Sequence, residues 1–364
     1  MGLRDFFGSS KPAKTMQTGL PPLTQPPPKA EPYLISQLEG EKITIPGSKG
    51  VFRILASSKQ TQNKIAVFTS GAVLSDAPGF HYHKEAHDVF LVTKGYLKLW
   101  NGDKCRIMGP GDFAYIPPTV IHNPEMLGPH TELLGLIAPG DWVDFFRYVA
   151  EADNSIIVPE FDERDLKGHI IPKVMAAKDR FDVHFVRDYQ PPEVSEWRDD
   201  ENKLPDGQEG YFLRFMTGPR WMAGGWMSRP FVTTKQNGGR FAISSIESSN
   251  LYPHPELFSK PLVFEKVDHC FCVQEGCLAV TLGGQQTLVR EGETLVIPSG
   301  QAFALQAWSK YVRVYSFTSG DGIEAVIHAA GEQQKGYVLP DQSPPLDASL
   351  FSKALRELCI RRVQ

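Results

Sequence analysis

Three histidines and one acidic residue between positions 81 and 122 have the spacing of a metal site. His81 and His83 are two positions apart, so on a strand both rings point to the same face. Asp88 precedes a run of strand-forming residues, and His122 follows a Gly-x5-Pro turn. Imidazole and carboxylate groups suit Zn, Cu, Fe, Ni, Co or Mn, because selectivity among these metals depends on geometry and supply. The sequence therefore predicts one divalent transition metal per chain, bound by these four residues.

The glycines and the proline that frame this pattern recur later in the chain at a constant offset of 181. The recurring pairs are Gly95 and Gly276, Gly111 and Gly292, and Pro117 and Pro298. The same offset puts Leu262, Phe264 and Phe303 at the places of His81, His83 and His122. The sequence therefore predicts an internal duplication in which only the first copy binds metal.

Glu85 and His87 compete with Asp88 as the fourth ligand, because both lie between the second histidine and the strand. The offset places His269 of the second copy opposite Asp88 and not opposite either neighbour. Asp88 is therefore the preferred ligand, and His87 is expected in a loop, near the metal or in solvent.

Short strands are the elements that must position these side chains. Apolar runs of about five to eight residues alternate with Gly, Asn and Asp turns. In the first half these runs are 51–55, 64–68, 89–93, 96–100 and 133–137. Many short strands separated by turns favour an all-β fold, here two tandem barrels with a few short flanking helices.

The chain is predicted to divide into five segments. They are a disordered proline-rich arm (1–31), an N-terminal barrel with the metal site (32–155), an inter-domain connection (156–205), a metal-free C-terminal barrel (206–335) and a C-terminal helix (336–364). The proline-rich arm is not expected to pair in a sheet. Residues 211–215 of the second barrel are expected to match 51–55 of the first, and Asp347 is expected to cap the C-terminal helix.

Composition narrows the class of protein. The 364 residues carry a formal net charge of -4 with both signs interspersed, so we expect neither DNA nor RNA as a partner. No apolar run approaches the roughly 20 residues of a membrane helix, so we expect no membrane partner. The N-terminus shows no export signal, no Asn-x-Ser/Thr sequon occurs, and the number of cysteines is odd. These features together favour a cytoplasmic location.

The histidine pattern resembles the two motifs of the cupin superfamily. The first motif is His81-Tyr82-His83-x4-Asp88-x6-Gly95, and the second is Gly111-x5-Pro117-x4-His122. With its duplication the chain resembles a bicupin, and residues 81–90, 97–100 and 135–140 are similar to the fungal quercetin 2,3-dioxygenases. The resemblance runs from about residue 32 to residue 330. It implies one jelly-roll barrel per copy, with the metal inside the first.

The resemblance also implies a dioxygenase that acts on a flavonol-like or other phenolic or polyketide aromatic. A glutamate in that family, at the position of Asp88, is both a ligand and the base. Asp88 is accordingly expected to deprotonate a metal-bound substrate, which dioxygen then attacks. Phe90 matches an aromatic residue of the family's substrate cavity, and Val92, Tyr115 and Met126 are further candidates for its apolar wall. A small aromatic molecule and dioxygen are thus the expected partners, and a homodimer is a family expectation.

Two other functions stay open. The shorter acid and the lack of export features also fit an intracellular isomerase, cyclase or lyase of secondary metabolism. Its metal would act as a Lewis acid while Asp88 moves a proton without oxygen. The third function is a non-catalytic binding protein, because the cupin fold hosts those as well. Oxygen consumption separates the first function from the second.

Overall fold

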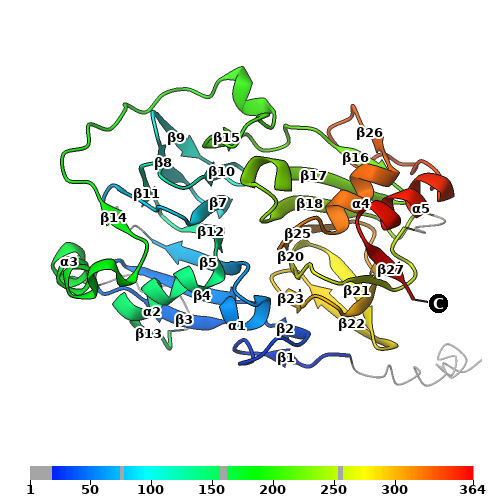
Figure 1. Ribbon diagram of the computed structural model, residues 1–364, viewed down its shortest axis with the longest axis horizontal. Helices are drawn as coiled ribbons and strands as arrows, with labels where there is room; N and C mark the ends of the chain where they lie inside the picture. The colour runs from blue at the N-terminus through cyan, green and yellow to red at the C-terminus, as the bar shows by residue number, and fades with distance from the viewer. Residues whose placement is uncertain (1–18, 74–77, 156–161, 253–256, 364) are drawn as a thin grey trace, which may run out of the picture.

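The computed structural model describes residues 19–73, 78–155, 162–252 and 257–363. Its strands form four sheets arranged as two barrels side by side, the first coloured mostly blue to green and the second mostly yellow-green to red (Figure 1). The helices are few and short and lie outside the barrels. The predicted all-β fold of two jelly-roll barrels is confirmed.

The first barrel combines an eight-stranded and a five-stranded sheet. In order, the larger sheet contains β13 (Glu151–Ala152), β3 (Glu41–Thr44), β4 (Gly50–Ala56), β5 (Ala66–Ala72), β12 (Thr131–Ala138), β7 (His87–Lys94), β10 (Phe113–Ile116) and β15 (Tyr211–Leu213). The smaller sheet contains β14 (His184–Phe185), β6 (His81–Tyr82), β11 (His122–Met126), β8 (Leu97–Asn101) and β9 (Lys104–Met108).

The second barrel combines a nine-stranded and a five-stranded sheet. In order, the larger sheet contains β1 (Pro22–Leu23), β2 (Tyr33–Ile35), β23 (Thr294–Ile297), β20 (His269–Glu275), β25 (Val312–Thr318), β18 (Ala242–Ser248), β17 (Trp226–Val232), β16 (Trp221–Ala223) and β26 (Glu332–Gln333). The smaller sheet contains β22 (Gln285–Arg290), β21 (Cys277–Leu282), β24 (Ala302–Ala307), β19 (Leu262–Phe264) and β27 (Ile360–Arg362).

The helices flank the barrels. They are α1 (Ser58–Thr61), η1 (Gly140–Val143), α2 (Asp144–Val149), α3 (Leu166–Ala177), η2 (Lys178–Arg180), η3 (Asp199–Asn202), η4 (Thr234–Asn237), α4 (Ile323–Ala330) and α5 (Ala348–Glu357). The carboxylate of Asp347 accepts hydrogen bonds from the backbone N–H groups of Ser349 and Leu350, which confirms the predicted cap of α5. No helix in the described part of the chain is long and apolar enough to span a membrane.

Equivalent residue pairs confirm the internal duplication. His81 lies opposite His122 where β6 pairs with β11, and Leu262 lies opposite Phe303 where β19 pairs with β24. The second pair packs in an apolar core that fills the second barrel. Gly95 and Gly276 recur because both have a positive φ, of 67° and 75°, which favours glycine.

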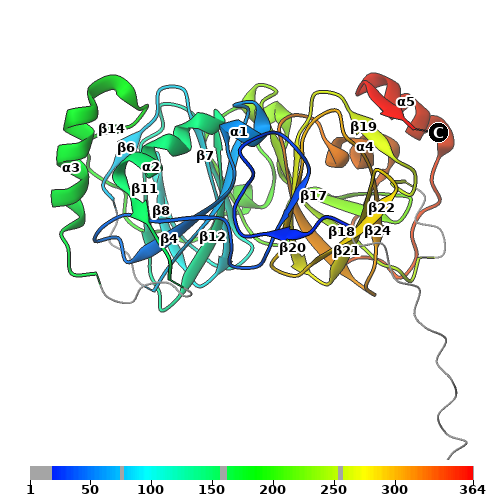
Figure 2. The same cartoon turned by 90° about the horizontal axis from the view of Figure 1, so that it is seen from below.

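The two copies exchange one strand each. Strand β2 pairs with β23 of the second barrel, and β15 pairs with β10 of the first. Figure 2 shows the blue N-terminal segment crossing the boundary between the barrels. The exchange places apolar side chains of both strands, such as Tyr33 and Tyr211, in a core shared by the barrels. The predicted match of residues 211–215 to 51–55 is therefore wrong, because β17 holds the place of β4.

The proline-rich arm is partly ordered. Residues 1–18 of the predicted arm lie outside the described residues. Pro22 and Leu23, however, pair in parallel with Leu34 and Ile35, so the prediction that this segment forms no strand is wrong. Strand β1 is the edge of its sheet, where a proline can lie because its missing N–H is not needed by a further strand.

Candidate metal centre

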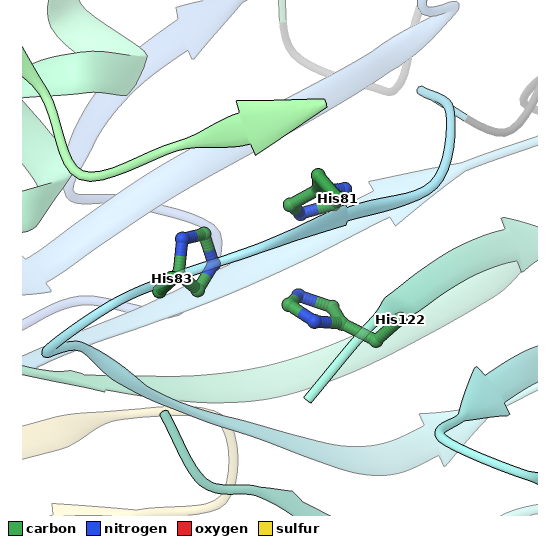
Figure 3. Close-up of side chains that lie close together, drawn as sticks. All are labelled: His81, His83 and His122. Atoms are coloured by element: carbon green, nitrogen blue, oxygen red, sulfur yellow. The ribbon is translucent and has the colours of Figure 1, made fainter. Parts of the chain in front are cut away.

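The three predicted histidines converge inside the first barrel. His81 and His122 face each other across β6 and β11, and His83 follows on the same face as His81. All three side chains are buried, and one nitrogen from each ring lies within 4.8 Å of the others. Figure 3 shows the rings pointing toward one another from two chain segments. The sequence prediction of these three residues as one cluster is confirmed.

Backbone carbonyl groups fix the orientation of every ring. In each histidine Nδ1 lies within hydrogen-bond distance of a carbonyl oxygen, which favours the tautomer with the proton on Nδ1. The pairs are His81 with Gly79 at 2.8 Å, His83 with Asp182 at 2.6 Å and His122 with Val120 at 3.0 Å. Nε2 of each ring is therefore left as the metal-binding atom. In His83 and His122 this atom is buried and has no hydrogen-bond partner among the described residues.

Burial keeps the rings of His81 and His83 uncharged. Desolvation, followed by the neighbouring His122, lowers the pKa of His81 well below its usual value and that of His83 to about 4. Both imidazoles are thus neutral at pH 7, which is the form that binds a metal. Three converging Nε2 atoms fit a divalent transition metal and leave further coordination positions open.

Asp88 lies beside the cluster and not within it. Its Oδ2 atom is 3.6 Å from Nε2 of His122, and its Oδ1 atom accepts a hydrogen bond from the backbone N–H of Val89 at 2.8 Å. The three-histidine cluster does not include this carboxylate. The structure therefore separates the predicted fourth ligand from the other three, in keeping with an acid one methylene shorter than glutamate.

The two competitors of Asp88 have other roles. Glu85 is exposed, and His87 is buried at the start of β7, where Nδ1 lies 2.7 Å from the hydroxyl of Tyr115. This contact belongs to the side of the sheet that faces the second barrel. The expectation that His87 lies in a loop is wrong, because β7 begins at His87, two residues before the predicted run 89–93.

An apolar cavity of about 140 Å³ borders His81 and Asp88. Phe90 and Met126 line it, as predicted. The structure places Val92 in the core of the first barrel and Tyr115 in the core between the barrels, so neither residue lies on the cavity wall. Other wall residues are Phe52, Phe68, Leu133, Trp142, Phe145, Phe146 and the hydroxyl-bearing Ser48 and Ser70.

The connection between the barrels supplies part of the site, which the sequence analysis missed. Strand β14 from this connection pairs with β6, so that Phe185 lies opposite His81. Leu166, Ile170, Val183 and Phe185 all line the cavity. The sequence predicted only an inter-domain connection here and assigned it no part in the metal site. The only signal to the contrary was a few apolar residues, which also occur on ordinary surface helices.

Asp182 is the main contact of this connection with the metal ligands. Its carboxylate accepts hydrogen bonds from three consecutive backbone N–H groups, those of residues 84–86. Its carbonyl oxygen accepts one from Trp142 Nε1 at 2.8 Å in addition to that from His83. Asp182 thus holds both the ring of His83 and the loop that follows it.

Comparison with known proteins agrees with this geometry. Residues 74–133, which include every candidate ligand, match the cupin domain family. The chain is 23% identical to quercetin 2,3-dioxygenase of Aspergillus japonicus, over 86% of this chain and 96% of that protein. It is 22% identical to quercetin 2,3-dioxygenase of Bacillus subtilis strain 168, over 86% of this chain and 90% of that protein. The chain is a bicupin that resembles quercetin 2,3-dioxygenase.

A solved structure supports the same fold for this bicupin. A variant of oxalate decarboxylase from B. subtilis superimposes with a TM-score of 0.50 and 13% sequence identity, over 82% of the bicupin and 79% of that chain. At this identity the likeness concerns the fold alone. The relatives found by sequence carry the names of enzymes, which supports an enzymatic role for the bicupin.

Proposed function

We propose that this bicupin is a metal-dependent dioxygenase that acts on a flavonol-like or other phenolic or polyketide aromatic. The observation that carries the proposal is a buried three-histidine cluster with one separate carboxylate, that of Asp88, at the wall of an apolar cavity. The similarity to two quercetin 2,3-dioxygenases over most of the chain supports the reaction class.

Asp88 is the residue that we expect to move the proton. A divalent transition metal held by His81, His83 and His122 would act as a Lewis acid on a phenolic or enolic oxygen and lower its pKa. The Oδ1 atom of Asp88 is held by the backbone N–H of Val89, whereas Oδ2 faces the histidines. This carboxylate can therefore accept the proton of a substrate hydroxyl at Oδ2.

The cavity wall would orient the body of the substrate. Aromatic and aliphatic side chains such as Phe90, Met126 and Phe185 bury an aromatic ring and exclude water from the reacting oxygen. His81 and Asp88 are polar residues on this wall, so the hydroxyl of a bound ring is directed to the metal side. The proposal keeps the cytoplasmic location that the sequence features favour and the homodimer that the family resemblance implies.

A second candidate function rests on the separation of Asp88 from the ligand cluster. A carboxylate that does not bind the metal is free to give a proton back as well as to take it. That property suits an isomerase, cyclase or lyase that needs no oxygen. The non-catalytic binding protein stays the third candidate.

Turnover of flavonols in air and under anaerobic conditions tests the proposal. We expect quercetin to be consumed together with dioxygen, and we expect Asp88→Asn to lower kcat by about 10²- to 10⁴-fold while the metal is retained. Glu85→Gln, at the exposed acid nearby, is the matched control. Turnover of a phenolic substrate that continues without oxygen would favour the second function. Tight binding of such molecules without turnover would favour the third.

A further inference from the structure

A second candidate binding site lies between the two barrels, around Arg53. A groove of about 310 Å³ is lined by β4, β5 and β12 of the first barrel and by residues 272–274 and 291–294 of the second. Arg53 lines this groove with only 7% of its surface exposed. Its position on β4 directs it away from the metal cavity, which Phe52 lines on the opposite face.

The guanidinium of Arg53 lacks a partner among the described residues. Its Nε atom is buried without a hydrogen bond, and its side chain forms no ion pair or hydrogen bond with any described residue. Thr69 lies directly opposite on β5, and its hydroxyl is also buried without a partner in the described part of the chain. An unpaired charge at a mostly buried position is costly, so a guanidinium that forms no ion pair beside an open groove is a candidate site for an acceptor from outside the chain.

The equivalent arginine of the second copy, Arg229, has partners within the chain. Arg229 holds the equivalent place on β17, opposite Ser245, as Arg53 is opposite Thr69. Arg229 is buried too, and its Nε atom likewise has no hydrogen-bond partner among the described residues. Its Nη atoms, however, donate to the carbonyl oxygens of Met216 and Tyr337, and one of them lies 3.4 Å from the carboxylate of Glu247.

Glu247 has no counterpart in the first barrel. It follows Ser245 by two positions on the same face of β18, and the residue two positions after Thr69 on β5 is Gly71. The second copy thus carries its own carboxylate for its buried arginine, whereas the first copy has a glycine at that place and an open groove.

We propose that the groove binds a small monocarboxylate, whose carboxylate lies beside Arg53 as that of Glu247 lies beside Arg229. A guanidinium presents two parallel N–H donors that match the two oxygens of a carboxylate, and the hydroxyl of Thr69 can donate a third hydrogen bond. The site is separate from the metal centre, so this proposal does not depend on the proposed dioxygenase function.

The rest of the groove restricts the charge of this ligand. Lys94 adds one positive charge, but the carboxylates of Glu39, Glu132, Glu291 and Glu293 also line the groove. Some of these acids have partners within the chain: Glu39 with Lys42, Glu132 with His130, and Glu293 with the backbone N–H of Arg290. Their negative charge repels multiply charged anions, which favours a ligand with a single carboxylate.

Thermal unfolding of the full, metal-loaded chain in acetate and in chloride at equal ionic strength tests this site. We expect acetate to raise the Tm of the wild type progressively and to leave the Tm of Arg53→Met unaffected. Acetate that reaches the metal would act on both proteins equally, so the difference between them reports on the groove. Replacing an unpaired buried charge by an apolar side chain is compatible with folding.

Gly71→Glu is the second variant, because it supplies the carboxylate that the second copy already contains. We expect it to have a higher Tm than the wild type without acetate and to lose the acetate dependence. A wild type that does not respond to acetate, or an Arg53→Met variant that responds as strongly as the wild type, would overturn the proposal.

Discussion

The backbone carbonyl of Asp182 lies 2.6 Å from Nδ1 of His83, although 99 positions separate the two residues in the chain. The hydrogen bond leaves Nε2 of His83 directed at the other two histidines. The carboxylate of the same aspartate holds the loop at residues 84–86. The connection between the barrels is therefore a part of the metal centre and not only a tether.

Replacing Asp182 by alanine is expected to weaken metal binding. The three N–H groups of the loop would lose their acceptor, and the carbonyl that orients His83 would lose its anchor. Partners of metal ligands typically contribute 10- to 100-fold in affinity. We expect a loss of that size in a competition titration with a chelator. Asp182→Asn, which keeps one acceptor oxygen, should recover part of it.

Asp188→Ala is the matched control for Asp182, because Asp188 is an exposed acid of the same connection. An Asp182→Ala variant that binds metal as tightly as this control would show that the connection does not orient the ligands.

Metal content should distinguish His83 from His87, two buried histidines four positions apart. His83→Ala removes one of three converging Nε2 atoms, so we expect the metal measured by plasma mass spectrometry to fall well below one ion per chain. His87→Ala removes a contact with Tyr115 on the far side of the sheet and should leave the metal content unchanged. Equal losses in the two variants would contradict the three-histidine assignment.

The local parts of this site could be predicted from the sequence. The spacing of His81 and His83 alone predicts that they share a strand face. The Gly-x5-Pro turn before His122, which recurs in the second copy, predicts that His122 belongs to the same site. The position of Asp88 relative to the ligands could not be predicted, because it depends on the length of one side chain in a folded barrel. Its placement on the cavity wall depends on how the whole barrel folds around it.

Contacts between distant segments account for the rest of the differences. Phe185 reaches the site as part of β14, and Asp182 lies two residues before this strand. Strand β14 has only two residues and therefore no periodic pattern that could identify it. The exchange of β2 and β15 depends on Tyr33 and Tyr211 packing between the barrels. A strand that is apolar enough for its own barrel is equally suited to the neighbouring one, so the sequence favours neither partner.

The ion pair of Arg106 with Glu201 is expected to fasten the connection to the first barrel. Both side chains are 2% exposed, and the guanidinium contacts both carboxylate oxygens, at 2.9 and 3.1 Å. Glu201→Ala leaves a buried guanidinium without its carboxylate, which costs about 3–5 kcal/mol. We expect that decrease in the free energy of unfolding measured by urea denaturation.

The exposed pair of Arg198 and Asp200 provides the control for Glu201. Its side chains are 67% and 47% exposed, so Asp200→Ala should change the free energy of unfolding by less than about 1 kcal/mol. A Glu201→Ala variant as stable as Asp200→Ala would mean that the buried pair does not hold the connection.

Glu324 should make the second barrel less stable as the pH rises. This carboxyl is buried at the start of α4, and desolvation raises its pKa from 4.5 to about 7. The folded protein therefore retains a proton that the unfolded chain releases between about pH 4.5 and pH 7. The free energy of unfolding must fall as the pH rises through this window, by up to about 1.4 kcal/mol for each unit of pKa shift.

Glu324→Gln replaces the ionisable carboxyl group by an amide that does not titrate and has nearly the same size. The free energy of unfolding of both proteins is measured by urea denaturation between about pH 4.5 and pH 7. The value for the variant minus that for the wild type should increase with pH and level off near pH 7. Burial lowers the pKa of His269 to about 3, which makes stability rise with pH, but this contribution is present in both proteins and cancels. Glu332→Gln, at an exposed position, is the control. A difference between Glu324→Gln and the wild type that does not vary with pH would contradict the raised pKa, because the wild-type carboxyl would then titrate as it does in the unfolded chain.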